Sequence, residues 1–464
     1  MNTKFHFIGI GGIGMGAIAS LLMDQGMKVT GSDIKDNDMT KSLRAKGAEV
    51  FIGHARENVG VPDIVVFSSA IDKNNPEILE TRRNQIELIP RGKLLAYLMK
   101  QKISITVAGT HGKTTTSSMV SSLLTQANLE PTTAVGGIIN CVKGNAVSGK
   151  GMYFVAEVDE SDGSFLHFSP AYSIITNMEY EHVDYFKSFE KMKERFSDFI
   201  SNTVKYGYVI VYGDDTALLD LVKESGRRAL TYGFGEHNDV RAKSVEWNGF
   251  GSTFECEIQG RSLGRILLNV PGEHNVLNAL ATIGLGYLLS IEEKIIRETL
   301  AEYEGVQRRF QVLSQKKDIT VVDDYAHHPT EITYTLKAAR EAAVNRVFAV
   351  FQPHRYSRFA QFREEFAECL RNCDHLIITD IYGASEQPIA GADVHSLVRQ
   401  IHQTMDKPVV YLPKEKIADY LVPLLMEGDL VITLGAGDIN KIGYQLGEIL
   451  ASSQSQKVNI AKKV

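Results

Sequence analysis

The chain has 464 residues, and at about 150 residues per domain this length predicts three domains. With 44% hydrophobic and 23% charged residues, each domain can bury an ordinary globular core. Lys and Arg number 50 against 56 Asp and Glu, so no basic excess favours broad binding to nucleic acid or to an anionic membrane. The four cysteines form no CxxC pair, so neither a disulfide framework nor a zinc site is indicated, and a cytoplasmic location is expected.

An almost uncharged stretch at residues 5–23 raises the question of a signal peptide or a membrane span. Five glycines interrupt this stretch: Gly9, Gly11, Gly12, Gly14 and Gly16. Their pattern is the one that a strand, a phosphate-binding loop and a helix require. Because no other apolar run approaches twenty residues, we expect no insertion into a membrane.

The first hundred residues alternate between strand and helix signals. Strands are expected at 5–10, 28–33 and 63–69. A helix expected at 93–100 ends in a polar segment, so we place a domain boundary near residue 101. The alternation predicts a doubly wound α/β domain with a parallel sheet.

The glycines of this first domain match a dinucleotide fingerprint. Gly9-x-Gly11-x-x-Gly14 follows a strand and opens a helix, and Asp33 ends the next strand. NAD is the obvious ligand for this pattern. The motif itself reports only a diphosphate beside a helix N-terminus, which a UDP-sugar supplies equally well, so both ligands stay open.

A second region is expected to carry a parallel sheet, with strands at 103–109, 153–158, 173–177 and 208–212. Residues 240–270 change to a period of two between turn residues, which predicts added antiparallel hairpins. A buried helix is expected at 275–289.

The strongest local signal directly follows the strand at 103–109 and precedes a helical segment. It consists of Gly109, Thr110, His111, Gly112, Lys113, Thr114 and Thr115. In such a loop backbone N–H groups face phosphate oxygens, Lys113 neutralises the β- and γ-phosphates and Thr114 ligates Mg²⁺. Val107 stands where the longer GxxxxGKT motif has its first glycine, so this is the shorter GTxGKT form.

Acidic residues follow the strand at 153–158. They are Glu157, Asp159, Glu160 and Asp162. Alternation along the strand places Glu157 and Asp159 on one face, at the sheet edge where open parallel sheets bind ligands, so a magnesium site is expected there. A second polar cluster, Asn177 to Asp184, follows the next strand and contributes His182. A solvated acidic loop is the alternative interpretation.

The third region has strands expected at 319–324, 347–352, 375–380, 409–412 and 430–438. Two dense polar stretches, 323–329 and 352–358, follow apolar strands that we expect to be neighbours in the sheet. Arg355 and Arg358 are suited to gripping a carboxylate or a phosphate. One arginine alone would favour a surface ion pair, but two polar clusters at neighbouring strand ends favour a binding site.

Six motifs in this order resemble the Mur ligases, the ATP-dependent amide ligases of peptidoglycan synthesis. They are GTHGKTT at 109–115, AEVDESD at 156–162, TNMEYEHVDYF at 176–186, GEHNVLNALA at 272–281, GVQRRF at 305–310 and DDYAHHPTEI at 323–332. The resemblance implies a Rossmann-like UDP-binding domain at 1–101 and a central P-loop ATPase domain at 102–305, with a parallel sheet plus a small antiparallel sheet. It implies a Rossmann-like amino-acid-binding domain at 306–464.

The variants GIGGIGMG, DDYAHHPTEI and FQPHRYSR look most like the family member that joins L-alanine to the lactyl carboxylate of UDP-N-acetylmuramate. This reaction proceeds through an acyl phosphate and gives ADP and phosphate. A ligase that recycles murein tripeptide is the alternative within the family. An NAD-dependent oxidoreductase explains only the first domain, and a P-loop regulator leaves the C-terminal polar stretches unexplained. A monomer or a homodimer is expected.

The resemblance also implies five sets of site residues. The UDP-sugar would contact Gly11, Gly12, Ile13, Gly14, Ser68 and Ser69, with Asp33 and His54 near the uridine. ATP would contact the loop 109–115, Asn275 and Asn278, and Arg309 and Asp324 of the C-terminal domain. Two Mg²⁺ ions would bind Thr114, Glu157 and His182, and the catalytic set would be Lys113, Glu157, His182, Arg309 and Asp324. Tyr325, His327, Arg355 and Arg358 would surround the alanyl group.

Overall fold

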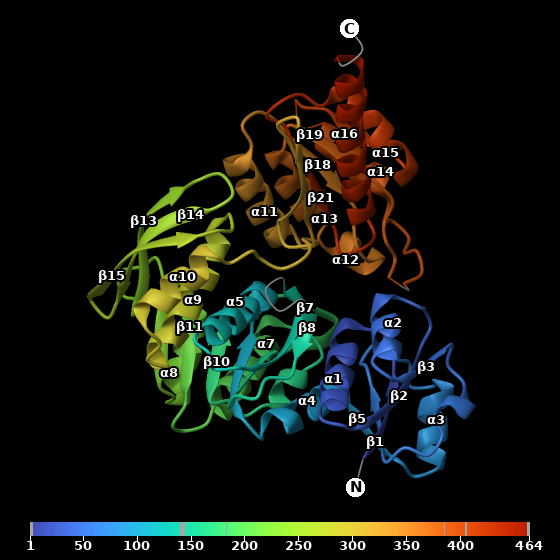
Figure 1. Cartoon of the computed structure of the whole chain (residues 1–464), viewed down its shortest axis with the longest axis vertical. Coiled ribbons are helices and arrows are strands. Elements are labelled where there is room, and N and C mark those ends of the chain that lie inside the picture. Colours follow the sequence, from blue (N-terminus) through green and yellow to red (C-terminus); the bar gives the residue numbers. More distant parts are fainter. Residues whose placement is uncertain (1–2, 140–143, 182, 385, 404–405, 462–464) are drawn as a thin grey trace. The chain divides into compact units, whose positions relative to one another are not determined.

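The computed structural model describes residues 3–139, 144–181, 183–384, 386–403 and 406–461 (Figure 1). The chain forms two compact units. The first consists of Met1–Ser244, Glu255–Ile266 and Leu277–Tyr303, and the second of Val245–Phe254, Leu267–Val276 and Glu304–Val464. The domain bounds inferred from the sequence stay a prediction. Among the described residues, no helix combines the length and the apolar character that crossing a bilayer requires.

The first unit begins with a five-stranded parallel sheet in the order β3-β2-β1-β4-β5. Its strands are β1 (Lys4–Ile8), β2 (Lys28–Asp33), β3 (Glu49–Ile52), β4 (Ile64–Phe67) and β5 (Glu87–Pro90). Its helices are α1 (Ile13–Asp24), α2 (Asp38–Ala45), α3 (Pro76–Arg83) and α4 (Arg91–Met99). Ile18 and Leu94 pack on one face of the sheet, and Ile78 packs with Ile8 on the other. The doubly wound arrangement predicted from the sequence is confirmed.

The central sheet has ten strands in the order β15-β14-β13-β12-β11-β10-β6-β9-β7-β8. They are β6 (Ile103–Ala108), β7 (Thr132–Ile139), β8 (Gly144–Val147), β9 (Tyr153–Glu157), β10 (Tyr172–Ile175), β11 (Tyr208–Tyr212), β12 (Ala229–Gly233), β13 (Val240–Trp247), β14 (Ser252–Ile258) and β15 (Arg261–Leu268). The helices are α5 (Lys113–Gln126), α6 (Val183–Phe186), α7 (Phe189–Asn202), α8 (Thr216–Ser225), α9 (Glu273–Leu288) and α10 (Glu293–Ala301). The predicted hairpin strands β13–β15 continue this same sheet. Strand β6 lies between β9 and β10, so three strand ends meet around the phosphate loop.

The second unit contains a six-stranded sheet in the order β16-β17-β21-β18-β19-β20. Its strands are β16 (Gln311–Lys316), β17 (Ile319–Asp324), β18 (Val347–Phe351), β19 (His375–Ile378), β20 (Val409–Tyr411) and β21 (Leu430–Leu434). Its helices are α11 (Pro329–Ala342), α12 (Tyr356–Gln361), α13 (Arg363–Cys369), α14 (Val394–His402), α15 (Lys414–Leu421) and α16 (Asn440–Ala461). Val322 packs on the face covered by α11, α13 and α14, and its neighbour Val321 packs on the face covered by α15 and α16. Because helices cover both faces of the sheet, β17 has apolar side chains on both faces, at Ile319, Val321 and Val322.

The strand order corrects one expectation. Strands β17 and β18 are not neighbours, because β21 lies between them and pairs with both. The crossover that inserts the last strand of the chain between two earlier ones leaves no local signal. The two polar stretches therefore start from strands that are one strand apart.

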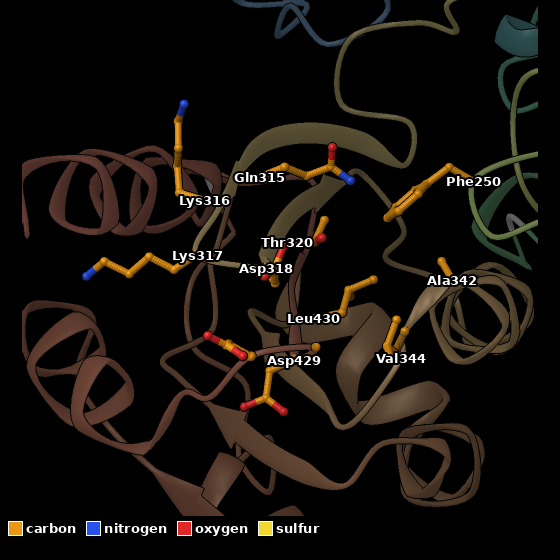
Figure 2. A pocket seen from close by; sticks show the side chains of 13 residues that line it. Phe250, Gln315, Lys316, Lys317, Asp318, Thr320, Ala342, Val344, Asp429 and Leu430 are labelled. Carbon is orange, nitrogen blue, oxygen red and sulfur yellow. The ribbon is translucent and has the colours of Figure 1, made fainter. Parts of the chain in front are cut away.

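A cavity of about 730 Å³ lies at the amino ends of β17 and β21 (Figure 2). Thr320 and Leu430, near the starts of these strands, line it together with Phe250. The picture shows Lys316 and Lys317 pointing outward from it. Ligands of open α/β sheets bind at the carboxyl ends of the strands, and this cavity lies at the opposite edge of the sheet. The volume of this cavity is therefore not evidence for a ligand site.

Candidate functional site

The phosphate loop connects β6 to α5 and needs glycine at two positions. Gly109 and Gly112 have φ values of +126° and +81°, in the region that side chains other than glycine rarely adopt. A Cβ atom on Gly109 would lie 2.2 Å from Thr176 Oγ1, and one on Gly112 would lie 2.6 Å from Asn278 Oδ1. The loop is therefore packed too tightly for any side chain at either position.

The segment after β10 holds this loop in shape. Thr176 Oγ1 donates a hydrogen bond to the carbonyl of His111 (2.6 Å), and the backbone N–H of His111 donates to Asn177 Oδ1 (2.9 Å). The N–H of Glu179 donates to Thr110 Oγ1 (2.9 Å). The sequence suggested metal or phosphate contacts for this segment. The side chains of Thr176 and Asn177 bond the loop at His111, and Thr176 also bonds the carbonyl of Ala108 at the end of β6.

Lys113 folds back onto the loop and a buried acid. Its Nζ donates to the carbonyl of Gly109 (2.6 Å) and to both carboxylate oxygens of Glu160 (2.9 and 3.0 Å). Burial alone would lower the pKa of Lys113, but the carboxylates of Glu160 and Asp159 raise this pKa above its ordinary value. Burial raises the pKa of Glu160 to about 7, although Lys113 opposes that shift. The ammonium group is therefore charged and positioned at the start of α5.

Thr114 and Glu157 lie in direct contact, as the sequence-based prediction of a shared metal requires. Thr114 Oγ1 donates to Glu157 Oε2 (2.8 Å), and the N–H of Gly136 donates to the same oxygen (2.9 Å). Octahedral Mg²⁺ with ligands at about 2.0–2.1 Å places neighbouring ligand oxygens about 2.9 Å apart. The two side chains therefore fit one magnesium ion. His182 lies outside the described residues, so its role at a second ion stays a prediction.

The glycine-rich loop of the first domain opens onto the same cavity as Glu157. This cavity measures about 350 Å³ and is lined by residues of both sites, including Gly12, Ile13, Gly14, Ser68, Ser69, Glu157 and Asp159. Asn145 Nδ2 donates to the carbonyl of Ile13 (2.8 Å) and so ties the loop to β8. A diphosphate at the N-terminus of α1 would therefore lie in one cavity with a candidate metal ligand.

Arg91 is a cavity residue that the sequence analysis missed. It begins α4 directly after β5, and among the lining residues of the cavity it is the one lysine or arginine. A Cβ atom on Gly14 would lie 2.7 Å from Arg91 Nη1, so the guanidinium lies against the glycine-rich loop. Recognising β5, a four-residue strand, would have placed Arg91 at a carboxyl strand end.

Asp33 and His54 lie at the carboxyl ends of β2 and β3. Asp33 Oδ2 accepts a hydrogen bond from the N–H of Gly11 (2.9 Å), and its Oδ1 accepts one from the N–H of Lys35 (3.1 Å). His54 Nδ1 lies 2.9 Å from Ser32 Oγ. Asp33 thus shapes the glycine-rich loop, and contact of either residue with a nucleoside stays a prediction.

In the second unit, the two polar stretches meet although β21 separates their strands. The rings of His327 and His354 are 5.6 Å apart, and those of Tyr325 and His327 are 5.4 Å apart. His327 Nδ1 lies 3.0 Å from the carbonyl of Tyr325. Arg355 has a φ of +68°, unusual for a side chain of its size, and donates its N–H to the carbonyl of Tyr382 (2.8 Å). Strain at this position indicates a constrained site.

His354 is the second residue whose place sequence analysis did not single out. Its ring stacks on Tyr382 at 5.6 Å, and its buried Nδ1 has no hydrogen-bond partner among the described residues. Burial, followed by the nearby His327 and Arg358, lowers the pKa of His354 to about 3. This imidazole is therefore neutral, with polar capacity left for a ligand.

Arg309 and Asp324 are anchored within the second unit. Asp324 accepts hydrogen bonds from the N–H groups of Phe310 and Ala326, each at 2.7 Å. Burial raises the pKa of Asp324 to about 6, against the opposing effect of Arg309. Arg309 lies over the ring of Tyr325, 5.2 Å from its centroid. Their contact with a nucleotide stays a prediction.

The two asparagines of α9 both bind protein groups. Asn275 Nδ2 donates to the carbonyl of Pro271 (2.7 Å). Asn278 Oδ1 accepts from Thr116 Oγ1 (3.1 Å), in the first turn of the helix that Lys113 begins. Asn278 therefore lies beside the phosphate loop, and adenine contacts for either residue stay a prediction.

Comparison with known proteins finds the same family along the chain. Three family models match in order: "Mur ligase family, catalytic domain" at 4–103, "Mur ligase middle domain" at 107–286 and "Mur ligase, glutamate ligase domain" at 308–437. A UDP-N-acetylmuramate–L-alanine ligase of Geotalea uraniireducens is 45% identical over 448 residues, which cover 96% of this chain and 98% of that protein. The ligase of the same name from Trichlorobacter lovleyi is 44% identical, with 96% and 98% covered.

Solved structures agree with the sequence relatives. The crystal structure of UDP-N-acetylmuramate-alanine ligase from Thermotoga maritima superposes with a TM-score of 0.84 at 31% identity, covering 97% of this chain and 99% of that one. A murein peptide ligase from Psychrobacter arcticus has a TM-score of 0.71 at 23% identity over 97% and 98% of the two chains, a likeness of fold alone. The α/β architecture, the ordered motifs and these relatives together establish that the chain belongs to the Mur ligase family.

Proposed function

We propose that the protein is an ATP-dependent ligase that joins L-alanine to the lactyl carboxylate of UDP-N-acetylmuramate in peptidoglycan precursor synthesis. The observation that carries this proposal is the shared cavity. Glu157, which contacts Thr114 of the phosphate loop, lines one cavity with the glycine-rich loop around Gly12. The proposed site for phosphoryl transfer therefore adjoins the proposed site for the diphosphate. Relatives 42–45% identical over nearly their whole length bear the name of this ligase.

The chemistry explains why both sites are needed. A carboxylate is a poor electrophile, so its condensation with an amine in water requires activation. The lactyl carboxylate oxygen attacks the γ-phosphorus of ATP, and the bond to the β,γ-bridging oxygen breaks to give ADP and an acyl phosphate. The alanine amine then attacks the acyl carbon, the tetrahedral intermediate collapses, and inorganic phosphate leaves with the former carboxylate oxygen. The amine loses a proton in this step.

The residues of the central domain would serve the first step. The charged Nζ of Lys113 would bind the phosphates and would then give up its present contact with Glu160. Thr114 and Glu157 would hold one Mg²⁺ and His182 would hold a second. Bound Mg²⁺ supplies positive charge that neutralises the phosphate oxygens. Asn275, Asn278, Arg309 and Asp324 complete the proposed ATP site.

The remaining residues would bind the two acceptor substrates. Gly11 to Gly14, Ser68, Ser69 and Arg91 would hold the diphosphate, with Asp33 and His54 towards the uridine. Arg355 and Arg358 would pair with a carboxylate, beside Tyr325 and His327. We further propose three domains at 1–101, 102–305 and 306–464, and a cytoplasmic location.

The proposal is tested by ADP release from purified protein with Mg²⁺, ATP and UDP-N-acetylmuramate. Three reactions are compared: L-alanine, the tripeptide L-Ala-D-Glu-diaminopimelate and no amine. Turnover with alanine alone supports the proposal. Turnover with the tripeptide alone would instead identify a recycling ligase, and no amine-dependent turnover would favour an ATP-binding regulator. Absorbance titration with NADH tests the oxidoreductase alternative, for which we expect no binding.

A further inference from the structure

A network of buried polar side chains connects β1, β2 and α3 in the N-terminal domain, and the proposed reaction does not use it. Its centre is Glu77 of α3, whose side chain is fully buried. The carboxylate accepts hydrogen bonds from His6 Nε2 (3.0 Å), Ser32 Oγ (2.6 Å), Asn58 Nδ2 (2.9 Å) and the N–H of Ala55 (3.1 Å). Burial would raise the pKa of Glu77, but the bonds from His6 and Ser32 lower it below its ordinary value. The carboxylate is therefore ionised and acts as an acceptor only.

This acceptor fixes the proton of its neighbour Ser32. A hydroxyl group has one hydrogen, and Ser32 gives it to Glu77. Ser32 Oγ also lies 2.9 Å from His54 Nδ1, where it can only accept a hydrogen bond. The same Nδ1 lies 3.5 Å from Glu77 Oε1, a second acceptor. His54 must therefore carry its proton on Nδ1, which leaves a lone pair on Nε2 in the neutral ring.

The surroundings of His54 indicate which kind of group the Nε2 lone pair would bind. The carbonyl of Ser32 accepts the N–H groups of Gly9 (2.8 Å) and Ile10 (3.0 Å), at the start of the glycine-rich loop. Two large apolar side chains stand exposed at the same sheet edge: Ile34 is 63% exposed and Ile52 is 50% exposed. Ile52 pairs with Asp33 across β2 and β3, two residues before His54. Apolar surface beside a hydrogen-bond acceptor is suited to a nucleoside, which has apolar ring faces and donor groups at its edge.

We propose that Glu77, acting through Ser32, is a positioning residue that holds His54 in the tautomer protonated on Nδ1, so that Nε2 accepts a hydrogen bond from the nucleoside of the UDP-sugar. This inference rests on the proposed function, which supplies the UDP-sugar. The donor is either the imide N–H of uracil or a ribose hydroxyl. Both present the same chemistry to Nε2.

The first test is ¹⁵N NMR of the histidine ring nitrogens in the full-length protein, without ligand and at neutral pH. In the unmodified protein, His54 should show a protonated Nδ1 and an unprotonated Nε2. In Ser32→Ala the proton should redistribute towards Nε2, because the nearer acceptor of Nδ1, at 2.9 Å, is gone and Glu77 Oε1 lies 3.5 Å away. A protonated Nε2 in the unmodified protein would overturn the inference, whatever the variant does.

Thr30→Val is the matched control. Thr30 Oγ1 lies 2.8 Å from His6 Nδ1, at the far end of the same network. Both substitutions remove one hydroxyl beside the Glu77 cluster, but only Ser32 touches His54. We expect both variants to lower the melting temperature, with the His54 tautomer changed in Ser32→Ala alone. Equal tautomer changes in the two variants would assign Ser32 a merely structural role.

The second test measures binding of UDP, 3-methyl-UDP and 2′-deoxy-UDP by calorimetry. Loss of one hydrogen bond should weaken UDP binding to Ser32→Ala by about 3- to 10-fold. The unmodified protein should bind the analogue that lacks the donor more weakly than UDP by the same factor. Ser32→Ala should bind UDP and this analogue with equal affinity. Unchanged affinity for both analogues would overturn the inference. If UDP binds and the tautomer is as stated but alanine supports no turnover, the proposed function alone fails.

Discussion

Thr114 and Glu157 are 43 residues apart in the chain, and their side-chain oxygens meet at 2.8 Å. One comes from the first turn of α5 and the other from the last residue of β9. The N–H of Gly136 holds the same carboxylate oxygen from a third side. This hydroxyl and carboxylate pair is the point at which the proposed metal site and the UDP-sugar cavity join.

Removing either oxygen should weaken the response to magnesium. We expect Thr114→Val and Glu157→Gln to raise the Mg²⁺ concentration for half-maximal ADP release by more than about 100-fold, because each is a proposed direct ligand. Thr125→Val is the control, since Thr125 lies near the end of the same helix and its hydroxyl donates to the carbonyl of Ser121. A normal magnesium response in both active-site variants would contradict the metal assignment.

Lys113→Ala should lower ADP release much more than UDP-sugar binding. Loss of the charged Nζ should lower ADP release by about 100- to 1000-fold. UDP-sugar binding should stay nearly intact, because its proposed contacts come from the N-terminal sheet. Calorimetric titration with UDP-N-acetylmuramate measures this second quantity. Equal loss of UDP-sugar binding and of ADP release would rule out the separation.

Arg91→Met should affect the UDP-sugar site selectively. Removing a charge-assisted contact to the diphosphate should raise the KM for UDP-N-acetylmuramate by about 10- to 100-fold and leave the KM for ATP unchanged. The matched control is Arg83→Met, because the side chain of Arg83 is 74% exposed at the end of α3. Steady-state kinetics with each substrate varied in turn makes the comparison. Parallel changes in both KM values would show that Arg91 has no specific role.

Gly112→Ala tests how tightly the phosphate loop is packed. The backbone conformation should cost about 1–2 kcal/mol, and the new Cβ should also displace Asn278. Gly226→Ala shares a positive φ, but its Cβ would meet nothing within 4 Å. We expect similar destabilisation from the backbone in both variants and loss of ATP binding only in Gly112→Ala. ATP titration and thermal unfolding of the two variants decide the matter; intact ATP binding in Gly112→Ala would contradict this packing.

Asp324 should make stability depend on pH. Burial raises its pKa to about 6 from an ordinary value of 3.8, so the folded protein holds a proton that the unfolded chain has released. The contribution of Asp324 to the free energy of unfolding is therefore complete below about pH 4. As the pH rises through about 6, this contribution is lost, on the order of 3 kcal/mol. Asp324→Asn should flatten the pH dependence of the melting temperature between pH 4 and 6. An unchanged slope in the variant would refute the assignment.

Much of the fold was predictable because its strands are buried and apolar. The expected ranges of β2, β11 and β17 agree with the structure to the residue. Six strands, β3, β5, β7, β8, β12 and β16, were not predicted. Among them, β3 and β5 have only four residues with an exposed first position, which gives little periodicity. The strand order of the C-terminal sheet could not be read either, because no local feature tells that β21 inserts between β17 and β18.

The candidate site divides in the same way. The phosphate loop and Glu157 follow predictable strands, so their pairing could be anticipated. Which of the clustered acids pairs with Lys113 could not, because Glu160 reaches it only through the turn after β9. The neutral state of His354 could not be predicted from the sequence, because it comes from burial among cations that several elements contribute.

In the proposed reaction, this protein activates a carboxylate by transfer of a phosphoryl group. The direct test uses UDP-N-acetylmuramate with ¹⁸O in its lactyl carboxylate, together with ATP, Mg²⁺ and L-alanine. We expect one ¹⁸O atom in the inorganic phosphate released for each amide formed, which ³¹P NMR detects. Amide formation with unlabelled phosphate would contradict the acyl phosphate and with it the proposed role of the Lys113 and Glu157 site.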